Sequence, residues 1–156
     1  MSEETDGTAL AGQARDALAQ RARWPWWYIG LMGLALLGLL AAPLVPHLTT
    51  WSGAYQAVMW PSLVILLFGD LLLSRLRGTA FSRKTLRAYP STRLTGVALL
   101  VVGVAGIVAV NLLVRAEETG PGIAVAIATA VIGAGLMCGM NAAMRRDIRD
   151  GRVVRP

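Results

Sequence analysis

Cysteine is almost absent from this sequence: its 156 residues include one, Cys138, inside a long apolar run. A single thiol excludes an intramolecular disulfide, a CxxC redox pair and a cysteine-based metal cage. It therefore also excludes the four-helix, quinone-linked thiol oxidoreductases, which need paired cysteines. Histidine is equally scarce. His47 has no second histidine to join it, so we expect no metal site.

Enzyme motifs are missing as well. The sequence contains no HExxH, no GxSxG, no GxxxxGK[ST] and no paired carboxylates on one helix face. It also lacks the DG…AR…G…D pattern of lipid headgroup transfer. We therefore expect no catalytic residue and no cofactor, and we interpret the chain as non-enzymatic.

Charge is sparse, whereas apolar residues are abundant and continuous. Only 15% of residues are charged, 55% are hydrophobic, and the mean hydropathy is +0.56. The apolar residues form runs of about 20, the length that crosses a hydrocarbon core of roughly 30 Å. The first run follows a charged lead and is too long for a signal peptide. The sequence thus predicts an all-α integral membrane protein.

Four spans are expected in one transmembrane domain, residues 26–144, at about 26–45, 54–73, 94–114 and 123–143. An aromatic cluster at residues 24–28 should anchor the first span at the membrane interface. Pro43 and Pro46 should end that span, and Pro61 should kink the second or mark its start.

Hydrophilic segments flank this domain. Residues 1–25 should be cytoplasmic, with a helix over 9–23 that either lies on the membrane surface or extends the first span. Its weak apolar stripe would contain Leu10, Ala14, Ala17 and Leu18. Residues 145–156 form a basic cytoplasmic tail that we expect to be frayed at its end.

The basic residues are divided unevenly among the connections. The N-terminal segment holds three, the middle loop six and the tail five, which together make 14 of the 15 Lys and Arg residues. Since Lys and Arg accumulate on the cytoplasmic side, both termini and the middle loop should be cytoplasmic. The net charge of +6 then reflects topology in the cytoplasmic membrane, and no nucleic-acid partner is expected.

Short outer loops make spans one and two, and spans three and four, antiparallel neighbours. The middle loop that joins these two hairpins either only fixes topology, binds anionic lipid headgroups or docks a cytoplasmic protein. Its basic residues are Arg75, Arg77, Arg83, Lys84, Arg87 and Arg93.

Small residues recur along the fourth span, where they would allow a neighbouring helix to approach closely. This stripe should pack either against the third span or against another subunit, a second copy or a larger partner. Its members are Gly122, Ala126, Ala130, Ala134, Cys138 and Ala142, with Gly135 and Gly139 on a neighbouring strip.

Three polar residues lie within the spans. Asp70 is the only acid there, near the inner end of the second span, and it is either an interfacial structural acid or a proton or cation relay. Asn111 and Asn141 lie near opposite ends of neighbouring spans. Each should form an interhelical hydrogen bond or line a polar pathway.

Two segments, WPWWYIGL and RLRGTAFSRKTLRAYP, resemble a set of small, uncharacterised actinobacterial four-span membrane proteins. Members of that set often accompany a winged-helix regulator. The resemblance implies a four-span fold and no activity, and it transfers no catalytic residue.

Two functional hypotheses follow. The first is an accessory or regulatory membrane subunit that acts by helix and loop association. The second is a small transporter or channel that uses Asp70, with Asn111 or Asn141 as further candidates, and that we expect to be oligomeric because four helices alone barely enclose a pathway.

Overall fold

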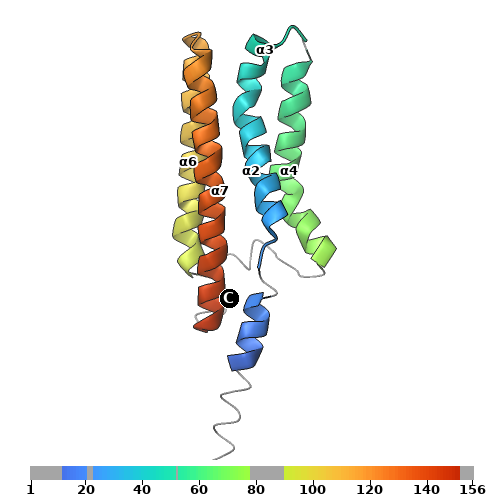
Figure 1. The fold of residues 1–156 in the computed structure, drawn as a ribbon, viewed down its shortest axis with the longest axis vertical. Helices are drawn as coiled ribbons and strands as arrows, with labels where there is room; N and C mark the ends of the chain where they lie inside the picture. Colours follow the sequence, from blue (N-terminus) through green and yellow to red (C-terminus); the bar gives the residue numbers. More distant parts are fainter. Residues whose placement is uncertain (1–11, 21–22, 52, 78–89, 152–156) are drawn as a thin grey trace, which may run out of the picture.

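The structure is a computed structural model that describes residues 12–20, 23–51, 53–77 and 90–151. These residues are helical apart from short connections, and no strand occurs among them. A short helix over residues 12–20 precedes the longer ones (Figure 1). The others are α2 (Trp26–Ala41), the 3-10 helix η1 (Ala42–Leu44), α3 (Val45–Leu48), α4 (Ala54–Arg77), α6 (Pro90–Arg115) and α7 (Thr119–Arg149).

Three helical stretches in the described part of the chain are long and apolar enough to cross a membrane. They are Trp26–Leu48, Ser91–Arg115 and Thr119–Arg149. The helix Ala54–Gly69 is apolar but shorter, and it forms the first two thirds of α4. The helical prediction is thus confirmed, and the chain has the long apolar helices of a membrane protein.

The first apolar helix extends past both prolines that were expected to end it. Pro43 lies in the first positions of η1, and Pro46 lies in those of α3. An N-terminal helical position needs no intrahelical N–H bond, so each proline begins a new short helix. The helical path therefore reaches Leu48, three residues beyond the predicted end.

Pro61 lies inside α4, which continues on both sides of it. The adjacent Ser62 hydroxyl donates a hydrogen bond to the Val58 carbonyl, 2.8 Å away. Such back-bonding to the preceding turn is a common response to a disturbed helical ladder.

Two predicted loop boundaries were wrong. Residues 74–77 and 90–93, expected in the middle loop, belong to α4 and α6. The sequence places the end of the fourth span near residue 143, but α7 continues through the start of the tail to Arg149. Tertiary contacts explain the second error, because Met144 and Ile148 are buried against Ala19 of the 12–20 helix.

The helix over residues 12–20 buries one residue, and that residue is not in the predicted apolar stripe. Ala19 is fully buried, whereas Ala14, Ala17 and Leu18 are exposed and Leu10 lies outside the described residues. Figure 1 shows this helix beyond the start of α2, near the end of α7.

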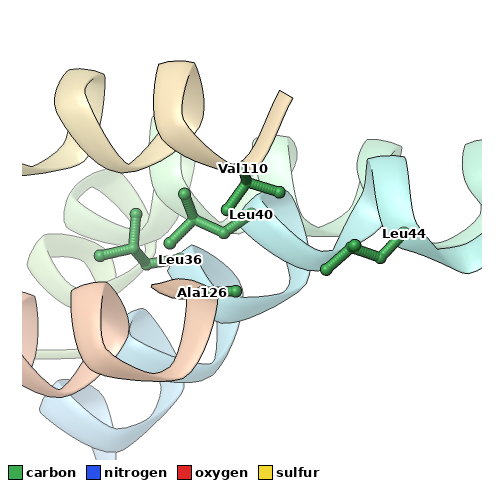
Figure 2. Packing of buried hydrophobic residues seen from close by; sticks show 5 residues of the cluster. All are labelled: Leu36, Leu40, Leu44, Val110 and Ala126. Atoms are coloured by element: carbon green, nitrogen blue, oxygen red, sulfur yellow. The ribbon is translucent and has the colours of Figure 1, made fainter. Parts of the chain in front are cut away.

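Helices α2 and α4 run antiparallel, as do α6 and α7 (Figure 1). α2 contacts α4 on one side and α7 and α6 on the other, so it joins the two hairpins. Figure 2 shows the middle of this contact, where side chains from α2, η1, α6 and α7 meet. This central cluster consists of Leu36, Leu40, Leu44, Val110 and Ala126.

Small residues let these helices approach closely. Gly106 of α6 faces Thr129 of α7, and an added Cβ would overlap that side chain. The small-residue stripe of α7 also contacts α2 and η1, in addition to α6. Gly122 lies against Leu44, and Ala134 lies opposite Gly33.

The stripe is therefore used only in part. Gly122, Ala126 and Ala130 are buried, whereas Cys138 and Ala142 are exposed. Gly135 and Gly139 also face outward, with no atom within 4 Å of an added Cβ. Among the described residues, none packs against Gly135, Cys138 or Gly139, which lie on the side of α7 that faces away from α2 and α6.

Candidate functional site

Two of the three polar residues singled out within the spans, Asn111 and Asn141, lie at opposite ends of the bundle. Asn141 is buried, and its side-chain oxygen accepts a hydrogen bond from the backbone N–H of Trp24, 3.3 Å away. Asn111 is exposed near the opposite end of the bundle, where its amide donates to the Ile107 carbonyl of its own helix. Asp70 belongs to α4, but its side chain lies outside the described residues. The structure therefore does not bring Asn111 and Asn141 together, and it describes no side-chain contact for Asp70.

Asn141 lies next to an apolar pocket that sequence reasoning did not identify. The pocket has a volume of about 220 Å³ and is partly open. Side chains from four helices line it, at the end of the bundle where α2 begins and α7 approaches its end. The lining residues are Trp24, Tyr28, Met32, Leu66, Leu99, Met137 and Met140.

Aromatic and thioether side chains shape this pocket. The rings of Trp24 and Tyr28 meet edge to face with centroids 5.7 Å apart. Met32 and Met137 are buried beside them. Methionine adapts to irregular occupants because its side chain is flexible and polarizable. Gly69 lets α4 approach at this level, since an added Cβ would overlap the end of Met32.

Toward the middle of the bundle, the pocket ends at tightly packed apolar side chains. Leu36 lies one helical turn beyond Met32 and begins the central cluster, which continues through Leu40 and Leu44. Val110 and Leu40 have almost no exposed surface. An occupant of the pocket thus meets apolar packing toward the middle of the described bundle.

A buried acid links α6 and α7 at the pocket's end of the bundle. Asp147 is 1% exposed, and its two oxygens accept the Ser91 backbone N–H at 3.1 Å and the Ser91 hydroxyl at 2.7 Å. Ser91 is in the first turn of α6, where N–H groups lack intrahelical partners and a negative charge is stabilised. Asp147 is therefore a cap supplied by the neighbouring helix.

Arg145 lies on α7 two residues before this cap. Its Nε atom is buried and has no hydrogen-bond partner in the described structure. Arg145 follows Asn141 by one turn and Met137 by two, so it continues the strip of α7 that lines the pocket. The pocket thus has a cationic group beside its apolar walls.

The residues of the predicted basic middle loop are only partly described. Arg75 and Arg93 are exposed on α4 and α6 at the same end of the bundle. Arg77 is in α4, but its side chain is outside the part that the structure describes. Arg83, Lys84 and Arg87 lie wholly outside the described residues. His47 is exposed at the end of α3. In the described ranges no three His, Cys, Asp or Glu residues gather as metal ligands would.

No protein-family model matches the chain, and neither the curated proteins nor the solved structures give a match. The resemblance to small actinobacterial four-span proteins stays an expectation. Function must be argued from the chain's own geometry.

Proposed function

We propose that this chain is a four-span protein of the cytoplasmic membrane with both termini in the cytoplasm, and that it works as a non-enzymatic accessory or regulatory subunit. The fourth span is α4, whose 24 residues extend about 36 Å at 1.5 Å per residue. The helix ends at which basic residues concentrate lie at one end of the bundle, which supports the orientation.

The outward strip of α7 is the observation that carries the associative role. Ala128, Gly135, Gly139 and Ala142 follow one another along an exposed face. Gly135 and Gly139 have open space around them. A second helix could approach the α7 backbone closely along this strip.

The outward face of α6 carries larger side chains than the segment of α7 from Gly135 to Ala142, although Gly96 and Gly103 of α6 also have open space around them and Val131 and Ile132 of α7 are exposed. Leu94, Val97 and Leu100 are each more than 60% exposed. Lipid tails are as apolar as these side chains, so bulk hydrophobicity gives no preference for a protein partner. Small residues do, because they allow close backbone packing. We therefore assign the α6 face to lipid and the outward strip of α7 to a transmembrane helix of a larger partner.

A polar transport pathway has less support. The described bundle is closed by the central cluster, and Asn111 faces outward. Association needs no such pathway.

The test is affinity purification from native membranes in mild detergent, comparing the wild type with Gly139→Leu. The leucine has room within the chain, and it favours helix more than glycine does. At a packed contact the added side chain should cost about 1–3 kcal/mol, so co-purified partner should fall by about fivefold or more.

The matched control is Gly30→Leu, the same change at an exposed glycine of α2 with equally open surroundings. It should leave the partner bound. Equal retention in all three proteins would remove the assignment of the α7 strip. Recovery of only a homo-oligomer would contradict the accessory role and direct attention to flux assays with Asp70→Asn.

A further inference from the structure

The pocket beside Asn141 is too small and too apolar for most soluble ligands. Its volume of about 220 Å³ is below the roughly 300–1,000 Å³ of pockets for drug-sized molecules. Enclosed apolar cavities of about 150 Å³ take up small apolar molecules, and this pocket has similarly apolar walls but is partly open, so an occupant can enter from the surface. A narrow hydrocarbon chain is therefore the occupant that its size and walls favour.

Arg145 adds a requirement that hydrocarbon alone does not meet. Nε of Arg145 is covered by the protein and has no acceptor, while the side chain as a whole is only partly buried, so its charge is within reach of a ligand at the surface. Phosphate oxygens suit a guanidinium because they accept parallel, charge-assisted hydrogen bonds. A ligand that combines an anionic group with an apolar chain therefore fits both the arginine and the pocket.

The spacing of these two features fits one molecule. Arg145 lies five residues beyond Met140 of the pocket, about 7.5 Å along the axis of α7 at 1.5 Å per residue. Arg145 lies toward the C-terminal end of α7, at the end of the bundle where the basic residues gather. In the proposed orientation, the headgroups of the cytoplasmic leaflet lie at this level.

We infer that the chain binds one anionic glycerophospholipid of the cytoplasmic leaflet, with an acyl chain between Tyr28, Leu99 and Met137 and its phosphate at Arg145. This inference rests on the membrane placement proposed above. The bound lipid links α2, α4, α6 and α7 at the end of the bundle, since each contributes to the pocket wall.

The experiment uses the full chain in nanodiscs that contain phosphatidylcholine and phosphatidylglycerol, followed by release and native mass spectrometry. The wild type should retain phosphatidylglycerol in preference to phosphatidylcholine. Arg145→Gln should lower that retention about fivefold, the equivalent of the ~1 kcal/mol that one basic residue contributes near an anionic lipid surface. Arg145→Lys should restore most of it.

Two further variants separate the site from general charge. Arg146→Gln removes the same charge from the adjacent, exposed position and should leave retention unchanged. Leu99→Trp fills the pocket and should reduce retention of either lipid.

The inference is overturned if Arg145→Gln and Arg146→Gln act equally, or if Leu99→Trp retains lipid as the wild type does. Equal retention of the two lipids by the wild type also overturns it, and this comparison needs no variant to fold. A chain that inserts but shows no lipid preference refutes this inference alone, whereas a chain that does not insert refutes the proposed function too.

Discussion

At the scale of single residues, the buried acid at the end of α7 has the clearest energetic role. Asp147 faces Ser91 with both carboxylate oxygens and is almost fully buried. Charge-assisted hydrogen bonds are roughly twice as strong as neutral ones. The pair joins the start of α6 to the end of α7, at the same end of the bundle as the pocket.

Removing this acid should therefore destabilise the bundle. We expect Asp147→Ala to lower the free energy of unfolding by about 1–3 kcal/mol, because it leaves a part-buried N–H and hydroxyl without their acceptor. Ser91→Ala should cost about 1 kcal/mol, since one of the two hydrogen bonds persists. Thermal unfolding of the detergent-solubilised protein, followed by circular dichroism, measures both.

The control is Asp16→Ala. Asp16 pairs with Arg149 at 3.2 Å, but both side chains are more than half exposed. Exposed ion pairs contribute about 0–1 kcal/mol, so this change should have little effect. If Asp147→Ala and Asp16→Ala shift the unfolding midpoint equally, the cap has no special energetic role.

At the scale of the elements, the connection between α6 and α7 is a closed helix end. The N–H of Glu118 bonds to the Leu113 carbonyl, and the N–H of Glu117 bonds to the Val114 carbonyl. These are the two bonds of a Schellman motif. Glu117 has a φ of 61°, a left-handed conformation that favours glycine and is strained for a residue with a Cβ.

Glu117→Gly should consequently stabilise the hairpin of α6 and α7, by up to about 1 kcal/mol. The gain is relief of left-handed strain, reduced by the greater freedom of glycine in the unfolded chain. Glu117→Ala retains the Cβ and should give no gain. Glu118→Gly, at a φ of −89°, should also give none. Unfolding midpoints of the three variants decide the point: a gain with alanine or at Glu118 would attribute the effect to charge.

The helices were predictable because a continuous run of about 20 apolar residues is the length of a helix that crosses a hydrocarbon core. Their ends were less predictable. Proline predicts a helix end at Pro43 and Pro46, yet each lies in the first two positions of a short helix that continues the path. The end of α7 was placed at residue 143 because the following residues are charged, but burial of Met144, Asp147 and Ile148 extends it. Such contacts with distant segments leave no local sequence signal.

The candidate site was predictable only in its polar member. Asn141 was singled out as an amide within a span, but its partner Trp24 is 117 residues away in the chain. Trp24 and Tyr28 were interpreted as an interface anchor, and the same aromatic rings line the pocket. No spacing pattern in the sequence predicts a pocket built from four helices, because each helix contributes only one to three residues to it. Arg145 was counted only as part of a basic tail.

At the scale of the whole molecule, the arrangement is polarised along its axis. The described bundle places Arg23, Arg75, Arg93 and Arg145 at one end, with the lipid pocket that we propose. The opposite end carries Arg115, Glu117 and Glu118. Between them, the long faces are mostly Leu, Val, Ile, Ala and Gly. This separation of charge by end supplies the argument for orientation.

The orientation of the chain in the membrane can be measured by labelling single cysteines, because only one native cysteine has to be removed first. In a Cys138→Ser background, single cysteines at Gln20, Thr49, Glu117 and Arg149 sample both ends of the bundle, and all four residues are exposed. A membrane-impermeant maleimide applied to intact cells should label Thr49→Cys and Glu117→Cys. It should label Gln20→Cys and Arg149→Cys only after the membrane is permeabilised, because 14 of 15 basic residues should keep those ends in the cytoplasm. The reverse pattern would invert the protein, and labelling of Thr49→Cys but not Glu117→Cys would mean an odd number of crossings between them. In that case α4 would not span the membrane, and the lipid at Arg145 would have to be sought in a different arrangement of the two hairpins.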